Sequence, residues 1–180
     1  GTQSRELALA FEKTAKDILD GSLGLWISHE KILGGEPSMN IISDQLSKCN
    51  YGIAFITPEN INAHWIYFES GAIANKLGLH FMCPYLFNVG FEEINRTPLG
   101  MLQALRADRE GTLNLIMRLN EITDPSMTKK RVIESRFDRY WDDLYSEYQK
   151  IQANYTFSKE LSKRKGKLID VLDKLPQKLH

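Results

Sequence analysis

The sequence predicts an α/β fold with a mostly parallel central sheet flanked by helices. Two continuous apolar runs, YGIAFIT at 51–57 and FMCPYLF at 81–87, are typical of strands buried on both faces. Segments with apolar residues at helical spacing precede, separate and follow these runs. Such alternation predicts parallel strands joined by right-handed crossovers, and the purely helical pattern beyond about residue 125 predicts a helical C-terminal third.

Composition is that of an ordinary globular domain with some extra helix. The chain has 180 residues, of which 42% are hydrophobic and 26% charged, and its formal net charge is zero. This balance gives no sign of a nucleic-acid or membrane partner, and no apolar run reaches the 18 residues that a membrane span needs. Cys49 and Cys83 stand in apolar surroundings without paired spacing, so we expect buried thiols in a reducing compartment, the cytoplasm.

The first helix is expected at residues 4–20, with Ser4 as its N-cap and Gly21 as its stop. Its apolar face recurs at spacings of four, four and three, at Leu7, Phe11, Ala15 and Ile18. A short strand is expected at 25–27, followed by a loop and then by a helix that has Pro37 in its first turn.

The strand at 51–57 is expected to end at Pro58, and the next helix to run over 62–76 and close at Gly78. In the second apolar run, Pro84 is an awkward residue for a strand interior because it lacks an N–H group. A polar segment then leads to a helix expected near 111–119.

The C-terminal third carries two apolar stripes. We interpret the first, which is rich in aromatic residues, as core or an oligomer seam rather than a nucleic-acid platform. A second helix is expected near 158–175. Residues 156–180 have a net charge of +4 and the remainder −4, which favours a solvated helix face over contact with an acidic partner. The first stripe comprises Ile133, Phe137, Tyr140, Leu144, Tyr148 and Ile151; the second comprises Leu161, Leu168, Leu172 and Leu175.

The order of elements departs from a doubly wound sheet in one respect. Such sheets begin with a strand, and in the flavodoxin-like order that first strand is central. Here the alternation begins with a helix. We therefore expect a first strand to precede Gly1 and to be missing from this chain.

The most informative chemical feature is the pair Trp65 and Glu69. Ligands of open parallel sheets bind beyond the carboxyl ends of the strands, and Glu69 lies in the helix that follows such a strand. At i and i+4, Trp65 and Glu69 share one helix face and combine an apolar wall with an ionised acceptor. Ser70, Gly71 and Ala72 add little bulk, so a ligand or helix could approach the backbone closely.

A structural interpretation of the same pair has Trp65 in the core and Glu69 solvated. Spacing alone favours it, because helical Glu is abundant. The neighbours weigh against it: Ile66, Phe68 and Ile73 also require burial, which makes Glu69 out of place unless it serves a site.

Other chemistries have weaker support. Gly34 and Gly35 give a flexible loop but not a P-loop, because no Lys-Ser/Thr follows. The histidines show no metal-ligand spacing, and no nucleophile-elbow pattern occurs. A metal site is therefore not expected.

Several segments in this order resemble the bacterial TIR (Toll/interleukin-1 receptor) domains of antiphage defence. They are SRELALAFEKTAKDIL, WISHEKILGGEP, YGIAFITPENINAHWIYFESGAIANKL and TPLGMLQALRADREGTLNLIMRLN, and ITPENINAHWIYFESGA is the most specific. The resemblance covers about residues 1–122. It implies a flavodoxin-like TIR domain at 1–124, lacking its first strand, and a helical extension at 125–180.

The resemblance also implies an activity. It places the family's catalytic glutamate on Glu69, its WxxxE tryptophan on Trp65, and its BB loop, which borders the pocket and mediates self-association, on Ser28 to Pro37. Catalytic members cleave NAD+ between nicotinamide and ribose, giving ADP-ribose or a cyclised product. NAD+ is then a substrate and no cofactor is needed; a sensor domain or activating partner is expected, and nucleic acid and membrane are not.

The residues make chemical sense of NAD+ cleavage. Nicotinamide is bound as a cationic pyridinium and leaves neutral, so no acid is required and one carboxylate could suffice. Glu69 would bind the ribose hydroxyls and stabilise an oxocarbenium-like transition state. Ser28, Ile32, Gly34 and Gly35 would border the pocket.

Ser4 and Arg5, at the start of the first helix, are the candidates for pyrophosphate contact. Two alternatives stay open: a TIR interaction module without turnover, and a nucleotide-binding sensor that makes no product.

Overall fold

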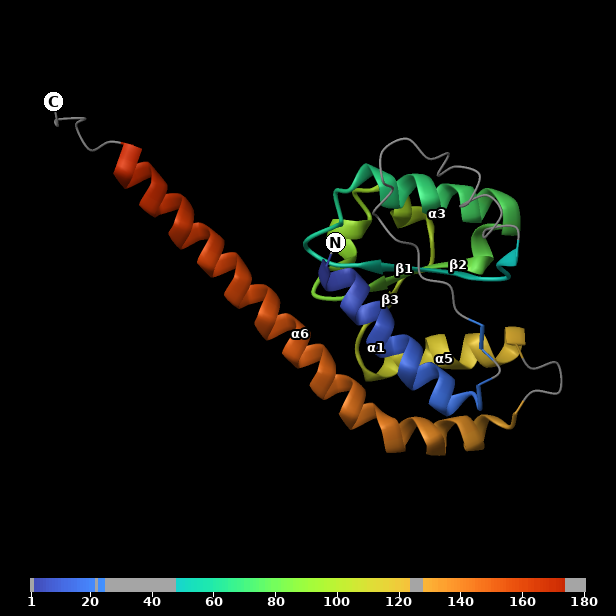
Figure 1. Ribbon diagram of the computed structural model, residues 1–180. Helices are drawn as coiled ribbons and strands as arrows, with labels where there is room; N and C mark the ends of the chain where they lie inside the picture. Colours follow the sequence, from blue (N-terminus) through green and yellow to red (C-terminus); the bar gives the residue numbers. More distant parts are fainter. Residues whose placement is uncertain (1, 22, 25–47, 124–127, 174–180) are drawn as a thin grey trace, which may run out of the picture.

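The computed structural model describes residues 2–21, 23–24, 48–123 and 128–173 (Figure 1). Within them the sheet has three parallel strands in the order β1-β2-β3. The strands are β1 (Gly52–Ile56), β2 (Met82–Leu86) and β3 (Leu105–Arg106). Both apolar runs are thus confirmed as strands, and the α/β class with a parallel sheet is confirmed. The strand expected at 25–27 lies outside the described residues, as does nearly all of the helix expected to begin at Pro37.

Helices cover both faces of the sheet, which gives three layers (Figure 1). One face is covered by α1 (Thr2–Ile18), α5 (Arg109–Thr123) and α6 (Lys130–Asp173). The other is covered by α3 (His64–Leu77), α4 (Phe91–Ile94) and the 3₁₀ turn η2 (Pro98–Met101), and a second 3₁₀ turn, η1 (Leu79–Phe81), leads into β2. No helix of the described residues is both long and apolar enough to cross a membrane.

Pro84 fits in the central strand because its backbone faces β3 rather than β1. Leu86 O accepts from Ala107 N at 2.8 Å on the β3 side, whereas Phe87 N donates to Ile56 O at 2.9 Å on the β1 side. Alternate residues of a strand point to the same neighbour, so Pro84 faces β3 as Leu86 does. Pairing with β3 begins only at Tyr85, so no ladder bond is lost where Pro84 lacks its N–H.

The larger core lies between the sheet and the layer of α1, α5 and α6. The four predicted apolar residues of α1 are at most 1% exposed, and the Phe11 ring lies 5.7 Å from Phe55 and 5.6 Å from Tyr85. The first C-terminal stripe packs into this core, which confirms its interpretation as core. Its buried members are Ile133, Phe137, Leu144, Tyr148 and Ile151, with Tyr140 partly buried beside them.

Three expectations about element ends and burial need correction. Ser4 is not an N-cap, because α1 already begins at Thr2. The two helices expected in the C-terminal third form one, α6, of 44 residues, since neither Gly nor Pro interrupts the backbone between the two stripes. Cys83 is 2% exposed as expected, but Cys49 is only half-buried.

Other boundaries agree with the sequence. Gly21, with φ of 71°, donates its N–H to Lys16 O at 2.9 Å and closes the end of α1. Gly78, with φ of 94°, donates to Ala74 O at 2.9 Å and closes α3. The short strand β3 was not predicted.

Candidate functional site

The carboxyl ends of the strands form the edge at which an open parallel sheet binds ligands. At the end of β1, the turn Thr57–Asn60 is fixed by a buried amide. Asn60 Oδ1 accepts from Thr57 N at 2.8 Å, and Asn60 Nδ2 donates to Phe55 O at 2.9 Å. Because both polar ends of Asn60 are satisfied and the residue is 5% exposed, the turn holds the start of α3 in a defined position.

The N-terminus of α1 reaches the same edge. Gln3 N donates to Glu59 Oε2 at 3.0 Å, which ties the first turn of α1 to the turn after β1. Ser4 is partly buried in this turn and Arg5 is exposed. A carboxylate therefore already interacts with the positive end of α1, the end that the sequence offered to a pyrophosphate. Of the two predicted contacts, the Arg5 guanidinium is the one that brings positive charge to this end.

Trp65 and Glu69 lie in the first and second turns of α3, the helix that follows β1. Their side chains are outside the part of the structure that can be described. The helix itself is held by a hydrogen bond from Tyr67 Oη to Ile61 O. By helical register, both positions lie on one side of the inward-facing row that contains Ile66. Ile66 packs, with residues of α4 and η2, on a second and smaller core on this face of the sheet.

One premise about α3 is corrected by the structure. Phe68 was expected to need burial but is 45% exposed, so α3 is not apolar on all sides. At Gly71, an added Cβ would meet no atom within 4 Å, so no described element packs closely on this position, and the approach of a ligand there stays a prediction. Ser70 does face inward: it is 1% exposed, and its Oγ has no hydrogen-bond partner among the described residues.

The predicted BB loop lies outside the described residues. This applies to Ser28, Ile32, Gly34 and Gly35, and to Pro37 at the end of the loop. Of the predicted site elements, the structure brings two to one edge of the sheet: the start of α1 and the start of α3, which the turn after β1 connects.

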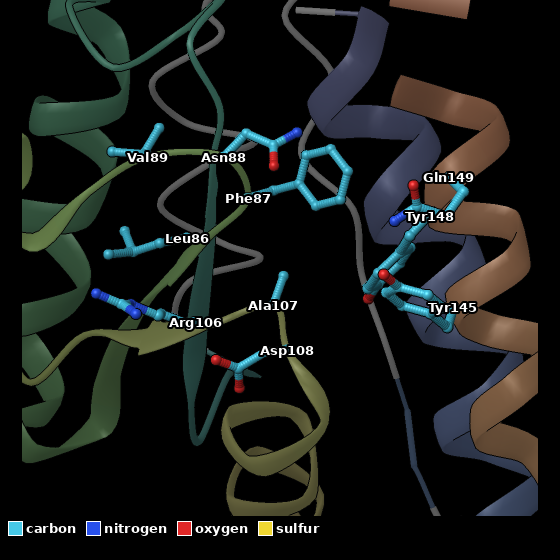
Figure 2. Close-up of a pocket in the computed structure, with 10 residues that line it drawn as sticks. All are labelled: Leu86, Phe87, Asn88, Val89, Arg106, Ala107, Asp108, Tyr145, Tyr148 and Gln149. Atoms are coloured by element: carbon cyan, nitrogen blue, oxygen red, sulfur yellow. The ribbon is translucent and has the colours of Figure 1, made fainter. Parts of the chain in front are cut away.

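A cavity that the sequence did not indicate lies farther along this edge, between the ends of β2 and β3 and helix α6 (Figure 2). Its volume is about 350 Å³. Phe87 and Asn88 point from the sheet toward α6, whereas Arg106 points away from it, and the tyrosines of α6 face the strands (Figure 2). The lining residues are Leu86, Phe87, Asn88, Val89, Arg106, Ala107, Asp108, Tyr145, Tyr148 and Gln149.

Two polar groups that line this cavity are already engaged within the protein. Asp108 Oδ1 already accepts from Gly111 N at 2.8 Å at the start of α5. Tyr148 Oη lies 3.3 Å from Tyr85 Oη, and burial raises the pKa of both tyrosines well above the ordinary value, so both stay protonated at neutral pH.

A hydrogen-bonded network connects the cavity with the start of α1. Gln152 Oε1, on α6, accepts from Asn88 Nδ2 at 2.6 Å and from Gln3 Nε2 at 3.1 Å. Gln3 is 3% exposed and in turn contacts Glu59. Sequence reasoning missed this network because its members are single polar residues 56 to 149 positions apart.

Cys83 is not a candidate nucleophile. Burial raises the pKa of its thiol to about 11, so thiolate is scarce at neutral pH. Among residues 2–21, 23–24, 48–123 and 128–173, no cluster of three or more His, Cys, Asp and Glu side chains could hold a metal ion.

No protein-family model, curated protein or solved structure is significantly similar to the chain.

Proposed function

We propose that this chain is a TIR-type effector that cleaves NAD+ at the bond between nicotinamide and ribose, with Glu69 as the catalytic carboxylate. The observation that carries the proposal is the segment ITPENINAHWIYFESGA, which places Glu69 in the second turn of the helix that follows β1. In an open parallel sheet, that position adjoins the edge at which ligands bind.

The arrangement around this edge supports the proposal. The sheet is parallel and covered on both faces, and the turn that leads to α3 is fixed by Asn60. The start of α1 adjoins that turn through Gln3 and Glu59. A dinucleotide lying along this edge would meet both helices, with Arg5 as the cation for its pyrophosphate and Trp65 beside the nicotinamide ribose.

The chemistry asks for one carboxylate. The C–N bond to a pyridinium breaks with its electron pair moving to the nicotinamide ring, which leaves neutral and needs no proton. Positive charge then develops on the ribose, and an ionised Glu69 stabilises it while accepting hydrogen bonds from the ribose hydroxyls. Water attack on the ribose gives ADP-ribose; attack by a group of the same molecule gives a cyclised product.

In this proposal, a sensor domain or partner triggers self-association through the loop Ser28 to Pro37, and self-association activates the enzyme. A role in antiphage defence accords with NAD+ depletion as the output.

The test is product analysis by chromatography after NAD+ is incubated with concentrated protein and a crowding agent. Wild type is expected to release nicotinamide. Glu69→Gln removes the negative charge at nearly constant shape and is expected to lower the rate by about 100-fold or more. Asp143→Asn is the matched control, because it neutralises an exposed carboxylate on α6, on the opposite face of the sheet, and is expected to keep the full rate.

The alternative, an interaction module without turnover, gives a different result. Neither wild type nor Glu69→Gln would then release nicotinamide, and both would still associate with other TIR domains. A nucleotide sensor would bind NAD+ tightly and leave it intact.

A further inference from the structure

The second half of α6 has no described element packed against it. The helix contacts the body as far as Ile151 and Gln152, and then continues to Asp173, projecting away from the three layers (Figure 1). At 1.5 Å per residue this projecting part, residues 153–173, which we call the stalk, extends roughly 30 Å. Gly166 within it costs about 1 kcal/mol in helix propensity relative to alanine, so propensity alone does not favour so long an exposed helix.

The stalk carries large apolar side chains in water. Phe157 is 63% exposed and Leu161 is 41% exposed, one helical turn apart on the same face. In the sequence their spacing continues through 164, 168 and 171, occupied by Arg, Leu and Val, with steps of four, three, four and three. A stripe of this period is typical of the seam of a two-helix coiled coil. It is narrow from Phe157 to Arg164, and Ile169 and Leu172 widen it toward the end of the stalk.

We propose that the stalk pairs in parallel and in register with the stalk of a second copy of this chain. One pair of opposite charges beside the seam favours this occupant. With Phe157 and Leu161 at d and a positions, Glu160 takes a g position and Lys165 the following e position. In a parallel pair, the g residue of one helix faces the next e residue of the other, so Glu160 of each copy faces Lys165 of the other.

Two polar residues lie in the seam of the stalk: Asn154, at the a position before Phe157, and Arg164, at a d position where it faces the same residue of the second copy. The aliphatic stem of Arg164 can cover the seam while its guanidinium reaches solvent or Glu160. Polar seam residues lower stability but fix register and helix number. Arg164→Leu is therefore expected to tighten the pair.

The test is sedimentation equilibrium of the whole 180-residue chain. Wild type is expected to form a dimer whose dissociation depends on concentration. Leu161→Asp places a charge in the seam and is expected to leave monomer only. Circular dichroism and thermal unfolding check that its body stays folded, as expected for a residue outside both cores.

Charge reversal tests the partner and the direction. Glu160→Lys and Lys165→Glu, each alone, are expected to weaken the dimer by about tenfold, because both symmetric pairs turn repulsive. The double variant, and an equal mixture of the two single variants, are expected to regain wild-type dissociation within about twofold. Lys163→Glu, a position away from the seam, is the matched control and should change little.

Three results would overturn the proposal. The first is a wild-type chain that stays monomeric at the highest concentration it tolerates; binding of that monomer to anionic vesicles or to an acidic protein would assign the stalk elsewhere. The second is a dimer that Leu161→Asp leaves intact. The third is a dimer that Leu161→Asp abolishes but that the double charge variant fails to restore, because its helices would not be parallel and in register.

Discussion

Replacing Gly111 with alanine tests the contact between the start of α5 and β3. In an ordinary helix this change stabilises a protein by about 0.5–1 kcal/mol. Here an added Cβ would lie 2.1 Å from Arg106 O and 2.9 Å from Arg106 N, far inside contact distance. The neighbour is backbone, so α5 and β3 must separate, which costs about 1–3 kcal/mol or more. Separation also lengthens the 2.8 Å hydrogen bond from Gly111 N to Asp108 Oδ1, which lowers the free energy of unfolding by about 1 kcal/mol more.

We therefore expect Gly111→Ala to lower the free energy of unfolding by about 2–3 kcal/mol, measured by urea denaturation. Gly71→Ala is the matched control, because this glycine is also helical but has open space around it. That variant is expected to gain about 0.5–1 kcal/mol. If Gly111→Ala is as stable as wild type, α5 does not approach β3 as described and the reasoning fails.

Three further predictions concern the core and the network at the carboxyl edge. Phe11→Ala is expected to lower the free energy of unfolding by about 3–5 kcal/mol in urea titrations, because the ring is 1% exposed; a loss below about 1 kcal/mol would contradict its burial. Burial raises the pKa of the Cys83 thiol from 9.0 to about 11, so the unfolded chain releases this proton first. Stability should therefore fall as the pH rises above 9, and between pH 8 and 10 the fall should be shallower in Cys83→Ala; equal slopes would refute it. Gln152→Ala leaves the buried Nε2 of Gln3 unpaired and is expected to lower the free energy of unfolding by about 1–3 kcal/mol. Thermal unfolding checks this against Gln149→Ala, a neighbouring glutamine outside this network; equal melting temperatures of the two variants would count against the network.

Apolar periodicity was sufficient to predict the elements whose buried residues form a clear pattern within a short stretch of sequence. The strands at 51–57 and 81–87 and the buried face of α1 follow from runs and spacings that are unambiguous within a dozen residues. β3 could not be found in this way, because two residues, Leu105 and Arg106, carry no pattern and pair only through the register of β2. The sequence predicted two helices where α6 is continuous, because the apolar residues move to another face of the helix between the two stripes and such a shift resembles the end of a helix.

The candidate site was less predictable than the fold. A motif in the sequence pointed to α3 and its carboxylate. Three polar residues hold the edge together, namely Glu59, Asn60 and Gln152, and they could not be predicted because their partners are distant in the sequence or specific to a turn. The exposure of Phe68 illustrates a general limit: apolar residues favour burial on average, and a single one gives no assurance of it.

The central claim is that Glu69 cleaves NAD+, and the most direct measurement is the rate of nicotinamide release by wild type and Glu69→Gln at equal concentration and equal folded fraction. The account predicts release by wild type and a rate lower by about 100-fold or more in the variant, with Asp143→Asn unchanged. Release by Glu69→Gln at a rate close to that of wild type would contradict it.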